Sequence, residues 1–189
     1  MKARKIKGLD PKAALADDAE RIVRVRLDEL IGFMPAAATD TRALHDLRIA
    51  AKRLRYVLEV THACFGAYAK TAIKPLKALQ DVLGEIHDAD VHLPDVAALL
   101  AEVIAADAAA TRGDPEALGS APGHRAYSGL VALQVRLRGR RATLLEEFLR
   151  QWESLERKGF RARLEFALIE RSQAVHDTDE PDAMMPHSP

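Results

Sequence analysis

One histidine and three basic side chains recur at helical spacing in this chain: His45, Arg48, Lys52 and Arg55. In a helix that turns by about 100° per residue, the three cations fall within about 80° of His45, beside the apolar stripe of the same helix. Solvated charges usually lie opposite such a stripe, so this row should border a neighbouring helix or a groove. Cations this close repel one another, which favours an anion lying over them.

The side chains in this row are the types that bind phosphate oxygens. Arginine offers a planar fork of donors, lysine a compact charge, and histidine a donor that depends on pH. A second row, spaced four and three residues apart, would share one face of the next helix: Lys70, Lys74 and Lys77. Two such rows on adjacent antiparallel helices would form a basic trough. Candidates for further walls of this trough lie on an earlier and a later helix: Arg21, Arg24, Arg136, Arg140 and Arg141.

The total charge hides this distribution. The chain has 28 basic and 28 acidic residues, a formal net charge of zero, which alone would argue against a polyanion partner. Residues 42–77, however, contain eight Lys or Arg against two acidic residues, and residues 125–163 contain ten against four, so each segment carries a local charge of +6. Charge runs of this kind are also common on ordinary solvated helix faces.

Helices are the only regular elements that the pattern predicts. We expect them at about 11–34, with Asp10 as cap and Pro35 as stop, at 40–65, capped by Thr39 or Asp40, and at 67–86, starting near Lys74 or kinked at Pro75. Further helices are expected at 94–111, 125–158 and 160–172, with Gly159 breaking the last two, and a loop at 112–123. Residues 1–10 should be a mobile basic lead, 11–172 one helical domain, and 173–189 a disordered acidic tail.

The second expected helix carries a regular apolar series at alternating steps of three and four: Leu44, Leu47, Ala51, Leu54 and Leu58. No alternating strand pattern accompanies it, so the fold class is all-α, an antiparallel helical bundle. The single Cys64 cannot form an internal disulfide, and neither a leader nor an apolar run of membrane length is recognisable. These features predict a cytoplasmic protein that is not inserted in a membrane.

Two segments, residues 44–56 (LHDLRIAAKRLRY) and 76–90 (LKALQDVLGEIHDAD), resemble the CHAD family, the conserved-histidine α-helical domain. The resemblance implies a helical bundle with a basic central cavity or groove that binds inorganic polyphosphate, in some members at polyphosphate granules. It makes His45 the name-giving histidine and assigns basic positions of the motif to Arg48, Lys52, Arg53, Arg55 and Lys77.

Family members commonly contain two related four-helix halves, each with a histidine motif, whereas this sequence has one good copy. Residues 125–152 have arginines but no matching histidine. Either the helix at 125–158 stands in for the second half, or two chains pair as a homodimer to complete the trough. The resulting expectation is a non-catalytic polyphosphate binder without a cofactor, whose site would take sulfate or phosphate in a crystal.

Other interpretations remain open. A basic trough also attracts nucleic-acid phosphates, although few aromatic residues are available for base stacking. A metal-dependent phosphohydrolase or an accessory module of one would need ligands, and four residues near one helix junction have suitable spacing: His87, Asp88, Asp90 and His92. A structural bundle that uses its basic rows for subunit contacts would predict no polyanion binding.

Overall fold

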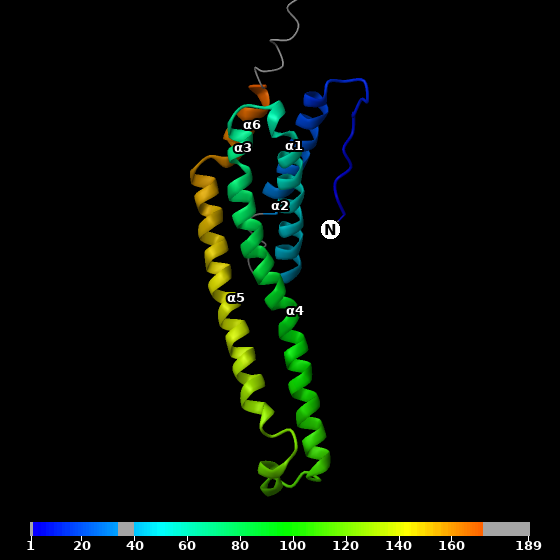
Figure 1. Ribbon diagram of the computed structural model, residues 1–189, viewed down its shortest axis with the longest axis vertical. Helices are drawn as coiled ribbons and strands as arrows, with labels where there is room; N and C mark the ends of the chain where they lie inside the picture. The colour runs from blue at the N-terminus through cyan, green and yellow to red at the C-terminus, as the bar shows by residue number, and fades with distance from the viewer. Residues whose placement is uncertain (1, 34–39, 172–189) are drawn as a thin grey trace, which may run out of the picture.

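Helices account for every regular element in the described part of the chain, residues 2–33 and 40–171 of a computed structural model (Figure 1). The prediction of an all-α bundle is therefore confirmed. Within the same residues, no helix has the length and apolar character that crossing a bilayer requires. The predicted stop at Pro35, the alternative cap Thr39 and the tail at 173–189 lie outside the described residues.

The first two helices, α1 (Leu15–Ile31) and α2 (Thr41–Thr61), pack against each other. α1 begins later than predicted, because Asp10 closes a turn instead: its side chain accepts a 3.0 Å hydrogen bond from the Lys12 amide. Asp40 caps α2 as predicted, accepting from the Arg42 amide at 3.1 Å. The apolar series predicted for this helix is buried: Leu44, Leu47, Ala51, Leu54 and Leu58.

The segment before α1 runs beside that helix in Figure 1. The amide of Arg4 donates to Oε1 of the buried Glu29 at 2.5 Å, and Arg21 donates to the carbonyl of Gly8. Arg26 forms an ion pair with the same Glu29 at 2.7 Å. These contacts connect residues 4–8 with α1, while the mobility predicted for the lead stays a prediction.

The helix predicted at 67–86 is divided at Ala72 into α3 (Tyr68–Thr71) and α4 (Ile73–Ala110), and a short 3₁₀ turn, η2 (His62–Cys64), precedes it. Pro75 is the third residue of α4, where its missing N–H needs no partner within the helix, so the predicted start near Lys74 is confirmed. The separate helix predicted to begin at Pro94 is wrong, because α4 continues through this residue. Packing of α4 on α5 offsets the roughly 3 kcal/mol that an internal proline costs.

The long helix predicted at 125–158 is confirmed as α5 (Ala126–Arg157), and η3 (Glu116–Ser120) lies in the loop before it. Gly159 adopts a left-handed conformation with φ of 63° and separates α5 from the short α6 (Phe160–Ile169), so the predicted break is confirmed.

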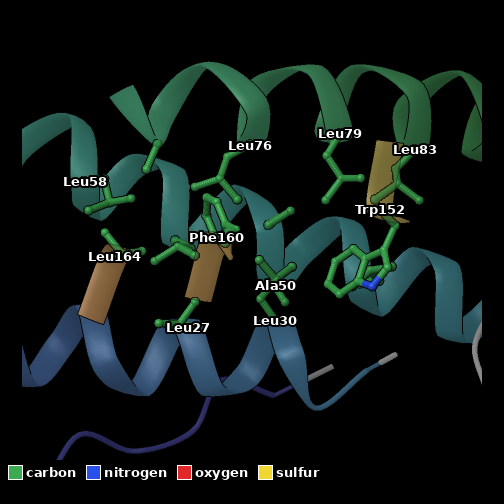
Figure 2. Close-up of a cluster of buried hydrophobic side chains, with 14 of the residues drawn as sticks. Leu27, Leu30, Ala50, Leu58, Leu76, Leu79, Leu83, Trp152, Phe160 and Leu164 are labelled. Atoms are coloured by element: carbon green, nitrogen blue, oxygen red, sulfur yellow. The ribbon is translucent and has the colours of Figure 1, made fainter. Parts of the chain in front are cut away.

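α4 lies between α2 and α5, α1 packs on α2, and α6 covers the end of the bundle beside α3 (Figure 1). The core in Figure 2 combines Leu27 and Leu30 of α1 with Leu76 and Leu79 of α4 and with Trp152 of α5. Residues 91–110 of α4 and 126–143 of α5 extend beyond this core as a two-helix hairpin, which we call the distal hairpin (Figure 1). The shared core therefore fixes the positions of α2 and α4, which carry the predicted site.

Candidate functional site

The row of basic residues on α2 lies along the contact between α2 and α4. The His45 ring lies 4.8 Å from the His87 ring of α4, measured between centroids. Arg55 Nε donates a 2.9 Å hydrogen bond to Oε1 of Gln80. α2 residues of increasing number thus meet α4 residues of decreasing number, as antiparallel packing requires. We call this surface the α2–α4 face: His45, Arg48, Lys52 and Arg55 of α2, with Gln80, Gly84 and His87 of α4.

Gly84 leaves room beside the row. A Cβ added to Gly84 would meet Arg48 Nε at 3.7 Å, and no other atom lies within 4 Å of it, apart from neighbouring residues and the backbone of its own helix. Close approach of another helix backbone therefore does not explain this glycine. Arg48 lies over Gly84, and its Nε would be in ordinary van der Waals contact with a Cβ at this position.

Two polar atoms of the face are buried without a hydrogen-bond partner in the described residues, His45 Nδ1 and Arg48 Nε. Both side chains are half-buried, so neither is freely hydrated. A buried polar group without a partner costs about 1–3 kcal/mol. A hydrogen-bond acceptor placed beside Arg48 Nε would remove this penalty.

The carboxylates of the described chain leave most of this row unpaired. Within residues 2–33 and 40–171, neither Arg48, Lys52 nor Lys77 forms an ion pair. Arg55 is the exception, because its guanidinium pairs with Glu59 at 2.6 Å. The positive field over the face therefore comes mainly from Arg48 and Lys52.

Tyr56 is the aromatic residue beside this row. Lys52 Nζ and the Arg55 guanidinium lie 5.5 and 4.5 Å from its ring centroid, so both cations hold one edge of the face in place. Arg53 is half-buried on α2, about 100° around the helix from Lys52. Lys77 is exposed on α4, one turn before Gln80.

Other predicted residues lie elsewhere. The break at Ala72 separates Lys70 on α3 from the later lysines, and Lys74 lines a cavity beside α5. Arg21 and Arg24 of α1 line a small pocket of about 220 Å³ with Asp17, Glu20 and Arg171, and Arg24 pairs with Glu20 at 2.8 Å. The structure therefore does not bring these residues together in the single trough that the sequence suggested.

The arginines of α5 connect that helix with α4. Arg140 pairs with Glu85, and Arg141 Nε lies 2.5 Å from Asp90 Oδ1 while its Nη2 donates to Thr41 Oγ1 at 3.4 Å. Arg136 is exposed on the distal hairpin. These residues do not form a wall of the α2–α4 face.

His87 is the residue whose role at this face the sequence analysis missed, since it considered His87 only as a metal ligand. Pairing residues 44–58 against 76–90 in antiparallel order would have placed it opposite His45. Asp90, another residue of that candidate metal set, is held by Arg141. Across the described ranges, no group of three or more His, Cys, Asp or Glu residues is placed to hold a metal ion.

Comparison with known proteins gives one match. Residues 3–94 match the family model of the CHAD domain. This range contains α1, α2, α3 and the first part of α4, and hence every residue of the α2–α4 face. No curated protein and no solved structure matches the chain.

Proposed function

We propose, from the membership of residues 3–94 in the CHAD domain family, that the α2–α4 face binds inorganic polyphosphate without catalysing a reaction on it. The observation that carries the proposal is the pair Arg48 and Lys52: both lie in one row on α2, and neither forms an ion pair among the described residues. A phosphate oxygen beside this pair would accept from the terminal N–H groups of Arg48 and from Lys52 and be attracted by both charges.

The length of the row favours an extended anion. His45 to Arg55 span ten residues of helix, about 15 Å at 1.5 Å per residue. A single phosphate can contact only part of this row, whereas a phosphate chain can contact Arg48 and Lys52 together. Each further cation contacted releases more counterions, so affinity should rise with chain length and fall with salt.

Nucleic acid is a weaker candidate for the same face. Single strands are usually held by bases stacked on aromatic side chains. On this face Tyr56 already lies under Lys52 and Arg55, so its ring serves to position cations. A ligand made of phosphate alone fits this arrangement better. The cytoplasm, and polyphosphate granules within it, are the location that we propose with this function.

A titration tests the proposal. Long-chain polyphosphate, tripolyphosphate and orthophosphate are each titrated at two salt concentrations into the wild type and the Arg48→Ala/Lys52→Ala variant. Loss of two charge-assisted hydrogen bonds, about 3 kcal/mol together, should weaken long-chain binding about 100-fold. Arg55 is left unchanged because it also contacts Gln80 and Glu59.

Arg136→Ala/Arg138→Ala is the matched control, because it removes the same charge from exposed positions of the distal hairpin. It should change the dissociation constant by no more than a few-fold. Equal weakening by the two double variants would show that binding follows total charge alone. Displacement of long-chain polyphosphate by duplex DNA at equal phosphate concentration would favour the nucleic-acid alternative instead.

A further inference from the structure

A second cationic surface lies away from α2. A cavity of about 680 Å³ opens between α3, the beginning of α4, the end of α5 and the beginning of α6. It lies beside two junctions, that of α3 with α4 at Ala72 and that of α5 with α6 at the left-handed Gly159. We call it the α3–α5 cavity. No residue of α2 lines it, so it is distinct from the α2–α4 face.

The lining of this cavity divides into two chemical parts. Its half-buried apolar surface comes from Tyr68, Pro75 and Leu155. Four exposed cations surround that surface: Lys74, Arg150, Lys158 and Arg163. The lining thus combines an apolar interior with a basic rim.

Glu147 is the one carboxylate in the lining, and Glu146, outside the lining, lies 4.0 Å from Arg150, so three cations of the rim, Lys74, Lys158 and Arg163, face a single lining carboxylate. Glu147 accepts a hydrogen bond from Gln151 at 3.1 Å. Lys74 and Lys158 form no ion pair with any residue in the described ranges. The charge of the rim is therefore available to an anion.

Tyr68 is held in place at the inner side of the cavity. The Arg163 guanidinium lies 4.1 Å from its ring centroid, and Phe160 meets the ring edge-on at 6.4 Å. Burial raises the pKa of the Tyr68 hydroxyl although the charge of Arg163 lowers it. The ring therefore forms part of a poorly hydrated wall next to a cation.

We infer that the α3–α5 cavity binds a small amphipathic phosphate ester, with its phosphate among Lys74, Lys158 and Arg163 and its apolar body against Tyr68, Pro75 and Leu155. The volume of about 680 Å³ is within the roughly 300–1,000 Å³ typical of small-molecule sites. Inorganic polyphosphate has no apolar part to cover this wall, so the ligand class differs from that of the α2–α4 face. The inference holds whether or not that face binds polyphosphate.

Two esters distinguish the sources of such a ligand: AMP represents nucleotides, and decyl phosphate represents alkyl phosphates. Each is titrated calorimetrically into the full chain, with inorganic phosphate as the head group alone. At least one ester should bind at one site per chain, at least about tenfold more tightly than phosphate. The ester that binds identifies the aromatic or the alkyl body as the one recognised.

Variants locate the binding. Ala78→Trp places an indole in the cavity and should weaken ester binding at least about tenfold, whereas Ala78→Ser at the same exposed position should not. Lys74→Gln/Lys158→Gln changes only exposed side chains and should also weaken ester binding at least about tenfold. This variant tests the inference even if Ala78→Trp fails to fold. Lys52→Ala should have no effect.

Three results would overturn the inference. The first is that neither ester binds more tightly than inorganic phosphate. The second is that Ala78→Trp, shown to be folded by circular dichroism, binds the ester with unchanged affinity. The third is that Lys52→Ala weakens ester binding as much as Lys74→Gln/Lys158→Gln, which would assign the ester to the α2–α4 face.

Discussion

Replacing Arg48 by methionine should make the protein more stable and less able to bind polyphosphate. Methionine keeps an unbranched, flexible side chain of similar reach while it removes the buried Nε donor and its charge. A buried donor without a partner costs about 1–3 kcal/mol, so the free energy of unfolding should rise by about 1–2 kcal/mol without ligand. For a chain of this size that corresponds to a melting temperature about 2–8 °C higher.

The assay is thermal or denaturant unfolding followed by circular dichroism, with and without long-chain polyphosphate. Because a ligand stabilises the state that it binds, polyphosphate should raise the stability of the wild type and have a smaller effect on Arg48→Met. The difference between the unfolding free energies of Arg48→Met and the wild type should therefore become smaller or change sign when polyphosphate is added. Arg138→Met is the control, since Arg138 is exposed on the distal hairpin, and its stability should change by less than about 0.5 kcal/mol.

The reasoning would be refuted if Arg48→Met lowered the unfolding free energy of the ligand-free protein by about 1 kcal/mol or more. Such a loss has the size expected when a satisfied buried hydrogen bond is removed. Arg48 would then be a structural residue, and it would not be available to bind an anion at the α2–α4 face.

Gly84→Ala should raise the unfolding free energy by about 0.5–1 kcal/mol, because its Cβ meets Arg48 only in ordinary contact, and should weaken polyphosphate binding. An unchanged dissociation constant would place the ligand away from Gly84. The hydrogen bond from the Tyr127 hydroxyl to Asp107 is the main cause that raises the pKa of Tyr127 from 10.0 to about 12. The contribution of this hydrogen bond to stability should therefore be complete below pH 10.0 and be lost as the pH rises toward 12. Tyr127→Phe should lose this alkaline dependence, which unfolding measurements across this pH range would show; an unaltered dependence would contradict the assignment. We also propose that two chains pair through the distal hairpin, where several apolar residues of both helices are exposed: Leu99, Ile104, Val131, Leu133 and Val135. Val135→Lys should then shift sedimentation toward the monomer, and a wild type that is monomeric at every concentration would exclude the pairing.

The parts of the fold that could be predicted are those determined by local chemistry. Asp40 caps α2 because its side chain accepts a hydrogen bond from the Arg42 amide in the first turn of the helix. Gly159 separates α5 from α6 because glycine adopts a left-handed conformation at little cost. Pro94 shows where such signals fail. Its local preference to end a helix is weaker than the packing of α4 on α5, which is formed by residues far away in the sequence.

The candidate site shows the same difference between features determined by local sequence and features determined by the packing of distant residues. The spacing of Arg48, Lys52 and Arg55 predicted a row on one helix, and this follows from helix geometry alone. Whether Lys74 or Arg141 faces that row depends on which helices become neighbours, and the sequence pattern did not determine this order. The partner of Arg141, Asp90, is 51 residues away, so its neutralisation could not be inferred from local spacing.

Two acidic residues of α4 form ion pairs with α5 and not with α2, which explains how a chain of zero net charge can present a basic face. Glu85 and Asp90 point toward α5, where they pair with Arg140 and Arg141 and hold the two long helices together. The α4 positions that meet the row on α2 are Gln80, Gly84 and His87, none of which is a carboxylate. Since successive helix positions differ by about 100°, residues 84 and 85 meet different neighbours, and one helix can neutralise α5 while it leaves α2 charged. Folding therefore separates charges that are balanced along the sequence, so the net charge of zero does not argue against an anionic ligand at the α2–α4 face.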